Sequence, residues 1–246
     1  MSDSSKTAVV TGASRGFGRA IAAAIVAAGA NVVGIARGEQ DLRAVGDELG
    51  ERFIPVAADA TDETVAREVI RTRRPTLLVL NAGVAPLMAP LHEQTWDTFS
   101  ANWHTDTRHV FTWVRAALRQ PLAPGSAVVV MSSGAALGGS PLSGGYASAK
   151  AAIRYIRGYA ADVSTREGLD LRFAALLPQL TPATELGMVG VTGYAALQGV
   201  DPDTFVGNMP AILTPEQVAK AVLDIANDPN SAAEYGISGT ELRPID

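Results

Sequence analysis

The stretch TAVVTGASRGFG, from Thr7 to Gly18, decides the fold that we expect for this chain. It begins with an apolar run at residues 7–11, continues through glycines at positions 12, 16 and 18, and opens an alanine-rich segment that reaches about Ala28. Glycines let a strand turn sharply into a helix and let the backbone approach a pyrophosphate, which the helix N-terminus then stabilises. The stretch therefore predicts a strand, a nucleotide-binding loop and a helix.

Downstream of this stretch, short apolar runs alternate with longer segments of helical character. Further strands are predicted at residues 31–36, 53–57, 76–80, 127–131 and 171–177, with a last short strand near 235–242. Helices are predicted at residues 39–49, 62–71, 94–120, 145–167 and 214–226. Strands that are apolar along their whole length are typical of a parallel sheet covered on both faces. We therefore predict an α/β fold, a doubly wound parallel sheet (a Rossmann fold) with three α/β/α layers and about seven strands.

The length and composition are those of one globular domain. The chain has 246 residues, of which 47% are apolar and 18% are charged. Single domains commonly reach about 250 residues, and disordered chains are richer in charge and poorer in apolar residues. We therefore expect one domain that spans residues 1–246. Residues 178–210 combine glycine and proline with many apolar side chains, so we expect an irregular segment there and a substrate lid at about residues 183–210.

The charge balance and the amino-acid composition argue against several classes of function. The formal net charge is −5, which provides no basic field for a nucleic-acid backbone. The chain has no cysteine and only three histidines, so we expect neither a disulfide nor a metal site. We interpret His104 and His109 as exposed helix residues. No apolar run reaches the roughly 20 residues of a membrane helix, and the polar start at residues 1–6 does not resemble a signal peptide, so we expect a cytoplasmic protein without membrane contact.

Charged and polar residues follow three of the predicted strands, at the edge where open α/β sheets bind ligands. Arg37 follows the second strand, where an acidic residue would favour NAD, and Arg15 lies in the glycine loop. Two cations near the ribose favour a 2′-phosphate and therefore NADP(H), although two solvated arginines would look the same in the sequence. Asp59 follows the third strand and can accept a hydrogen bond from an adenine amino group. Asn81 and Gly83 follow the fourth strand, where they can shape the backbone beside the cofactor.

A tyrosine and a lysine share one face of the long helix predicted at residues 145–167. Tyr146 and Lys150 are four residues apart in the sequence YASAK. A neighbouring ammonium stabilises a phenolate, so the pair is suited to proton transfer in an alcohol–carbonyl interconversion. Ser133, at the end of the fifth strand, can donate a hydrogen bond to the reacting oxygen. Such a pair taken alone would also fit a protein surface, and it is the glycine loop upstream that favours catalysis.

These motifs resemble those of the short-chain dehydrogenase/reductase family, in its single-domain type with TGxxxGxG and YxxxK. TGASRGFG, NAG at residues 81–83, a serine pair before a glycine, and YASAK stand in the family's order across about residues 6–242. The resemblance implies that Tyr146 is the catalytic acid or base, that Lys150 activates it and holds the nicotinamide ribose, and that Ser133 orients the substrate. The cofactor-binding residues that it implies are Gly12, Ser14, Arg15, Gly16, Phe17, Gly18, Arg37, Asp59, Ala60, Asn81, Ala82, Gly83, Tyr146, Lys150, Pro178 and Thr181.

Two positions depart from the family pattern. The family often has Pro-Gly after the sixth strand, and this chain has Pro-Gln at 178–179, which leaves open whether Thr181 or Thr184 contacts the nicotinamide carboxamide. The fourth catalytic residue of the family is an asparagine on the helix after the fourth strand. The spacing to the end of that helix places Asp106 there, while Asn102 lies one turn earlier on the same face. Asp106 is therefore our candidate for the fourth catalytic residue, with Asn102 as the alternative.

Together the motifs predict an NADP(H)-dependent oxidoreductase that transfers a hydride between the cofactor and the carbon of a carbonyl or secondary alcohol. The expected partner is a small molecule, and the apolar lid favours an uncharged or partly apolar one. A non-catalytic NADP-binding sensor or scaffold on the same fold is the alternative. The alanine-rich helix at 147–163 has more apolar positions than a monomer needs, so we expect a homo-oligomer, either a homotetramer as the resemblance implies or a homodimer.

Overall fold

The computed structural model of the chain describes residues 6–245. These residues form the strands β1 (Thr7–Thr11), β2 (Asn31–Ala36), β3 (Phe53–Ala57), β4 (Leu77–Leu80), β5 (Ala127–Met131), β6 (Arg172–Pro178), β7 (Glu234–Ile237) and β8 (Leu242–Pro244). All eight lie in one sheet, in the order β3-β2-β1-β4-β5-β6-β7-β8. Neighbours from β3 to β7 are parallel, whereas β8 pairs antiparallel with β7. The predicted doubly wound sheet is confirmed, and the single strand expected near residues 235–242 is a hairpin of two.

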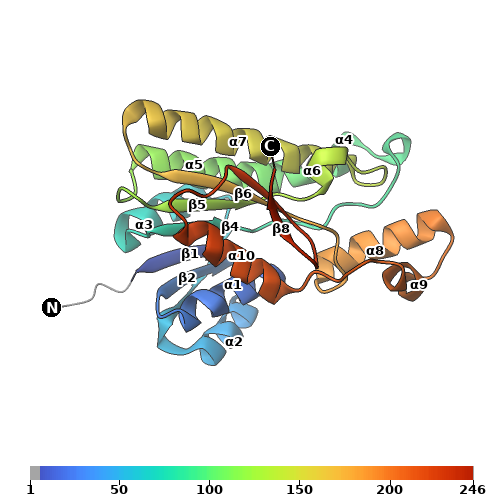
Figure 1. The fold of residues 1–246 in the computed structure, drawn as a ribbon, viewed down its shortest axis with the longest axis horizontal. Coiled ribbons are helices and arrows are strands. Elements are labelled where there is room, and N and C mark those ends of the chain that lie inside the picture. Colours follow the sequence, from blue (N-terminus) through green and yellow to red (C-terminus); the bar gives the residue numbers. More distant parts are fainter. Residues whose placement is uncertain (1–5, 246) are drawn as a thin grey trace.

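Helices cover both faces of this sheet (Figure 1). They are α1 (Gly16–Ala27), α2 (Glu39–Leu49), α3 (Glu63–Arg73), α4 (Trp96–Asn102), α5 (Arg108–Arg119), α6 (Ala135–Gly138), α7 (Gly144–Glu167), α8 (Glu185–Gln198), α9 (Pro202–Gly207) and α10 (Pro215–Asn227), with 3₁₀ turns at Gly50–Arg52 and Leu91–Glu93 and a π-helical turn at Trp103–Thr107. α1, α2 and α10 pack on one face, and α3, α5 and α7 pack on the other. Within residues 6–245, no helix is long and apolar enough to cross a membrane.

The two apolar cores form because the central strands are buried on both faces. All five residues of β5 are buried, as are most residues of β1 and β2. Successive side chains of a strand point to opposite faces of the sheet. Val10 and Val79 accordingly belong to the core that includes α1 and α10, whereas Val9 and Leu78 belong to the core that includes α5 and α7. Burial on both faces is the physical reason for the continuous apolar runs in the sequence.

Residues 183–210 differ from the irregular segment that the sequence predicts, because they form α8 and α9. α8 contains Gly187, Gly190 and Gly193, and glycine lowers helix propensity by about 1 kcal/mol relative to alanine. The packing of α8 accounts for the first of these glycines. A Cβ on Gly187 would lie 1.9 Å from the carbonyl oxygen of Thr181. Close contact with the segment that immediately precedes the helix thus requires a poor helix former inside α8, and the glycine hides that helix from sequence reasoning.

The helical region predicted at residues 94–120 is interrupted. α4 and α5 are joined by the π-helical turn at Trp103–Thr107, which contains the buried Asp106. A π turn holds one residue more than an α turn and often occurs at a functional site. This turn lies beside the loop that follows β4, and it positions side chains of the candidate active site.

Candidate active site

A cavity of about 1270 Å³ opens at the carboxyl edge of the sheet. It is lined by the glycine loop after β1, the residues that follow β2 and β3, the loop after β4, the segment from Met131 to Tyr146, and the chain that runs from Pro178 into α8. β1 lies between β2 and β4, at the point where the strand order reverses. Ligands of open α/β sheets bind at such a point, outside the carboxyl ends of the strands. The cavity is therefore the candidate active site.

The glycine loop needs its glycines for two different reasons. Gly12 and Gly16 have φ angles of 68° and 53°, in the left-handed region that favours glycine. Gly18 has no room for a side chain, because a Cβ there would lie 2.0 Å from the carbonyl oxygen of Gly12. Within the described chain, no side chain caps the N-terminus of α1, so a ligand can bind its first N–H groups. The loop is built to hold an anionic group such as a phosphate.

Thr11 ties the glycine loop to the loop that follows β4. Its buried hydroxyl oxygen accepts hydrogen bonds from the N–H groups of Asn81 and Ala82, at 2.9 and 3.1 Å. The Asn81 side chain donates in return from Nδ2 to the carbonyl oxygen of Thr11, at 3.0 Å. These contacts hold residues 81–83 beside the glycine loop on the wall of the cavity.

His109 supports the same junction, and its burial contradicts the exposed position expected from the sequence. His109, on α5, is 0% exposed, and its Nε2 lies 2.9 Å from the hydroxyl oxygen of Thr11. Burial, and after it the charge of Lys150, lower the pKa of His109 to about 3. The imidazole is therefore neutral near pH 7. Asn102, Asp106 and His109 are spaced as i, i+4 and i+7, and this polar stripe on a helix is the sequence signal that could have revealed the buried position.

Asp59 follows β3, and its carboxylate is stabilised by local hydrogen bonds. Oδ1 accepts from the N–H and from the hydroxyl of Thr61, at 2.8 and 2.9 Å. The bond from the Thr61 N–H is the largest cause that lowers the pKa of Asp59, and the charges of Arg37 and Arg108 lower it further. Both arginines line this end of the cavity, and sequence reasoning missed Arg108.

The other predicted cation of the glycine loop, Arg15, forms an ion pair with Glu185 at the start of α8. Both side chains are largely exposed, at 72% and 73%. Exposed ion pairs contribute at most about 1 kcal/mol, so a competing anion can displace Glu185 at low cost.

Lys150 lies at the centre of the predicted catalytic group. Its Nζ donates to the carbonyl oxygen of Met131 at 3.1 Å, and it lies 3.1 Å from Asp106 Oδ2 and 5.5 Å from the ring centroid of Tyr146. Burial acts to lower the pKa of Lys150, but the charge of Asp106, the electrostatic interaction with Tyr146 and the hydrogen bond with Asp106 together outweigh it and raise that pKa. Tyr146 and Ser133 are half-buried and line the same cavity as Lys150.

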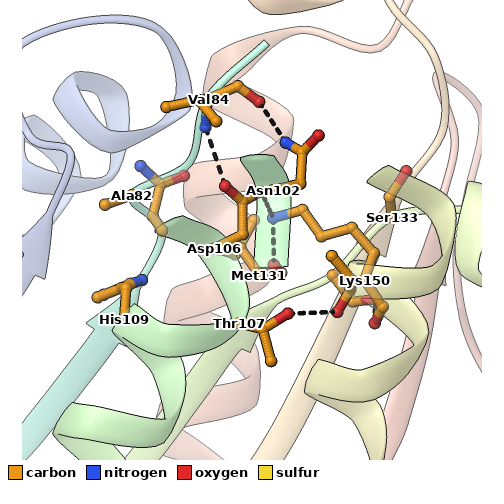
Figure 2. Close-up of polar contacts among 12 residues, drawn as sticks. Ala82, Val84, Asn102, Asp106, Thr107, His109, Met131, Ser133 and Lys150 are labelled. Carbon is orange, nitrogen blue, oxygen red and sulfur yellow. Dashed lines mark hydrogen bonds and ion pairs between the residues drawn. The ribbon is translucent and has the colours of Figure 1, made fainter. Parts of the chain in front are cut away.

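Asp106 and Asn102 both hold Val84, in the loop that begins with Asn81 (Figure 2). Asp106 Oδ1 accepts from the Val84 N–H at 3.0 Å, and Asn102 Nδ2 donates to the Val84 carbonyl oxygen at 2.8 Å. Of these two buried side chains, it is Asp106 that forms the ion pair with Lys150 in the described chain. Both sequence candidates thus support one peptide segment, but the carboxylate alone adds a charge beside the lysine.

The two threonines after β6 differ in what they contact. The buried Thr181 donates from its hydroxyl to the carbonyl oxygen of Leu213 at 2.6 Å. Thr184 caps α8 by accepting from the N–H of Gly187 at 3.0 Å. A Cβ at Gly16 would lie 3.4 Å from the methyl carbon of Thr184, so Thr184 is the threonine that packs against the glycine loop.

Most of the residues that the sequence assigns to the site line this one cavity. They are Gly12, Ser14, Arg15, Gly16, Phe17, Arg37, Asp59, Ala60, Asn81, Ala82, Gly83, Ser133, Tyr146, Lys150, Pro178 and Thr181. Gly18 and Asp106 are not part of the lining. Gly18 packs behind the loop against Gly12, and Asp106 lies behind Gly83, where a Cβ would come within 2.9 Å of its Oδ2. These two residues act on the site from behind its surface.

Residues 6–188 match the family model described as short chain dehydrogenase. The chain belongs to this family of oxidoreductases. An NADP-dependent 3-hydroxy acid dehydrogenase from Salmonella typhi is 27% identical over 245 residues, covering 96% of this short-chain dehydrogenase and 94% of the relative. Cis-4-hydroxycyclohexanecarboxylate dehydrogenase from Sinomonas cyclohexanicum is 32% identical over 231 residues, covering 91% and 90%. The crystal structure of a short-chain dehydrogenase from Streptomyces avermitilis is similar with a TM-score of 0.80 at 26% identity, covering 97% of this chain and 90% of that one.

Proposed function

We propose that this short-chain dehydrogenase uses NADP(H) to interconvert a carbonyl and a secondary alcohol. The observation that carries the proposal is that Tyr146, Lys150 and Ser133 line the same cavity as the glycine loop. The Salmonella typhi relative supports the choice of cofactor, because its name states NADP dependence. The bound nicotinamide cofactor supplies or accepts the hydride, and the protein supplies orientation and proton transfer.

The glycine loop and its flanking residues are our candidates for holding the cofactor. Gly12 and Gly16 leave the backbone open to a pyrophosphate, and the N-terminus of α1 carries the partial positive charge that suits it. We propose that Arg37 and Arg15 bind the 2′-phosphate of the cofactor. Arg15 then gives up its ion pair with Glu185 and pairs with the phosphate instead. Further proposed contacts come from Ser14, Phe17, Asp59, Ala60, Asn81, Ala82, Gly83, Pro178 and Thr181, with Thr184 as the alternative to Thr181.

In the reductive direction, Tyr146 donates its phenolic proton to the carbonyl oxygen of the substrate. Ser133 donates a hydrogen bond to the same oxygen, and the ammonium of Lys150 stabilises the phenolate that remains on Tyr146. Asp106 is a positioning residue, since it contacts Lys150 and Val84 and does not line the cavity. In the oxidative direction each proton moves the opposite way.

The chain is proposed to work as one domain, in which residues 183–210 form the substrate lid. This lid segment consists of α8, α9 and their connections, and α8 lines the cavity from Glu185 to Tyr194. Lids of this kind shape the substrate pocket and exclude water from the reaction.

The test is Tyr146→Phe, which removes one hydroxyl group and leaves the ring in place. We expect turnover of a carbonyl substrate to fall at least about 100-fold, because general acid catalysis contributes about 10²–10⁴-fold. NADPH affinity, measured by fluorescence titration, should stay at the wild-type value. Tyr155→Phe, an exposed tyrosine on the same helix, is the control and should be fully active. Undiminished turnover by Tyr146→Phe would exclude the proposed proton donor, and a wild-type chain that binds NADPH but reduces nothing would favour the sensor or scaffold.

A further inference from the structure

The cavity has a second end beyond the catalytic residues, which we assign to the substrate. It is formed by the loop of residues 84–88, the segment 139–143 and α8, all of which contribute to the lining. These segments contact one another. A Cβ on Gly193 of α8 would lie 2.8 Å from the Met88 side chain, and the hydroxyl of Tyr194 is hydrogen-bonded to that of Ser140. The loop, the segment and the helix therefore form one enclosure.

Apart from the carboxylate of Glu185 at the start of α8, which pairs with Arg15, the polar groups of this enclosure are neutral and largely bonded to one another. Ser143 donates from its hydroxyl to Ser140 Oγ at 2.7 Å, and Ser140 Oγ also contacts the hydroxyl of Tyr194. The neighbouring lining side chains of Met88 and Val189 are apolar. Hydroxyl groups can bond to a neutral polar group of a ligand, but they provide no charge that balances an anion.

Most cations of the cavity lie at its cofactor end. Among the described residues, the basic side chains of the lining are Arg15, Arg19, Arg37, His104, Arg108, His109 and Lys150. The charges of Arg37 and Arg108 help to lower the pKa of Asp59. Arg19 forms an ion pair with Glu48 of α2. His109 is neutral, because its pKa is lowered to about 3.

The two cations nearest the catalytic group and the lid already have carboxylate partners. Lys150 pairs with Asp106, and Arg15 pairs with Glu185. The remaining basic side chain of the lining, among the described residues, is His104, which is exposed on the π-helical turn. Electrostatic attraction at an exposed position is weak because water screens it.

From this arrangement of charges we infer that the substrate is a ketone whose body carries no charge, such as one that bears an alkyl group, a ring, an ester or an amide. An ionised carboxylate bound in this enclosure would lose its hydration without gaining a counter-ion, which is strongly unfavourable. The inference rests on the proposed function and narrows its substrate class. The names of the two relatives describe hydroxy acids, so this enclosure would distinguish the chain from them.

The test compares each acid with its own ester, so that the reacting ketone stays the same. Suitable pairs are methyl 4-oxocyclohexanecarboxylate with 4-oxocyclohexanecarboxylate, and ethyl 3-oxobutanoate with 3-oxobutanoate. NADPH oxidation by the wild-type enzyme should give kcat/KM values at least about 100-fold higher for the ester, the scale of discrimination available when a polar group is left unpaired. Equal values, or higher values for the acid, would overturn the inference.

A substitution in the loop of residues 84–88 tests whether the lack of a cation is the reason that the ester is preferred. Met88 is half-buried and lines the enclosure, so Met88→Lys should raise the acid-to-ester ratio of kcat/KM at least about tenfold through the added charge. Met88→Leu is the neutral control and should leave the ratio unchanged. His104→Gln should also leave it unchanged. A lower ratio in His104→Gln would assign an acid-binding role to that histidine and overturn the inference.

The same assays separate this inference from the function on which it rests. Reduction of the acids at least as efficiently as their esters, abolished by Tyr146→Phe, would overturn the uncharged substrate class and leave the proposed oxidoreductase in place. Reduction of neither member of any pair, nor of a panel of simple ketones, by an enzyme that binds NADPH would overturn both.

Discussion

At the scale of single residues, Asp106 places a carboxylate where the family pattern has an asparagine. Its Oδ2 lies 3.1 Å from Lys150 Nζ, and the side chains are 0% and 6% exposed. Removing one partner of a buried ion pair is costly, because the other charge remains without compensation. The pair also has a consequence for the reaction, since the charge of Asp106 helps to raise the pKa of Lys150.

We predict that Asp106→Asn keeps most of the activity and moves the alkaline limb of the pH–rate profile to lower pH. The amide can still accept from the N–H of Val84, so the loop stays in place. Without the carboxylate, however, the pKa of Lys150 falls, and the ammonium that stabilises the phenolate is lost at lower pH. Asp106→Ala should cost more, because it also leaves the part-buried N–H of Val84 without its acceptor, and an unsatisfied buried donor costs up to about 1–3 kcal/mol.

The control for this prediction is Asn102→Ala, which removes the other bond to Val84 without removing a charge. Its pH–rate profile should keep the wild-type alkaline limb at a reduced maximum. An alkaline limb of Asp106→Asn that overlays the wild-type limb would show that the carboxylate does not set the charge of Lys150.

His109 is expected to make folding sensitive to acid. An unfolded histidine titrates near pH 6.5, whereas the pKa of His109 in the folded chain is about 3. Between these values the unfolded chain binds a proton that the folded chain does not. The free energy of unfolding should therefore fall as the pH falls from about 6.5 towards 3, by up to about 1.4 kcal/mol per pH unit from this residue.

His109→Gln should remove this share of the acid sensitivity. The glutamine amide can still bond to Thr11 and has no proton to gain in this range. Urea unfolding between pH 7 and pH 5 should show a smaller loss of stability than in the wild type. His92→Gln, at an exposed position, should show the wild-type slope, and a wild-type slope in His109→Gln would contradict the assignment.

At the scale of elements, the end of β2 is placed to determine the choice of cofactor. Arg37 follows this strand and lines the cavity, and its charge helps to lower the pKa of Asp59, which follows β3. Arg37→Asp should lower the preference for NADPH over NADH at least about tenfold, because a carboxylate repels the 2′-phosphate and can accept from a ribose hydroxyl. The ratio of the two KM values measures this. Arg43→Asp on α2, outside the cavity, controls for the change in net charge, and a wild-type enzyme that binds NADH as tightly as NADPH would refute the prediction.

At the scale of the whole molecule, α5 and α7 carry an exposed aromatic surface. Phe111, Tyr155 and Tyr159 are 50%, 67% and 66% exposed, and the two tyrosine rings stack with centroids 6.4 Å apart. Exposed apolar patches mark interaction surfaces, so we predict a homo-oligomer that pairs through these helices.

Light scattering at micromolar concentration should give a multiple of the 25.5 kDa chain mass, four times that mass for the homotetramer or twice for the homodimer. The double variant Tyr155→Lys with Tyr159→Lys should shift the mass towards one chain, because charged side chains would be buried in the interface. Leu91→Lys, at an exposed apolar residue that belongs to neither helix, should not. A single 25.5 kDa species in the wild type would refute the oligomer.

Much of the fold could be predicted because its strands are encoded locally. β1, β2, β3 and β5 begin and end at the residues that the sequence predicts, since each is a short apolar run bounded by turn or capping residues. The residues of the glycine loop and the YASAK segment are likewise recognisable, because spacing along one turn or one helix fixes their relative positions. Parallel strands that end at one edge then bring these motifs to one cavity.

The remaining features depend on contacts between segments that are distant in the chain. α8 contains Gly193 although glycine is a poor helix former, because a Cβ there would lie 2.8 Å from the side chain of Met88, and only the folded chain supplies that neighbour. The ion pair of Asp106 with Lys150 and the burial of His109 arise where α5, the π-helical turn and α7 meet. Residue type and spacing determine which groups this chain possesses. Tertiary packing decides which of them lose water and which charges become neighbours, because desolvation and Coulomb attraction depend on distances in space.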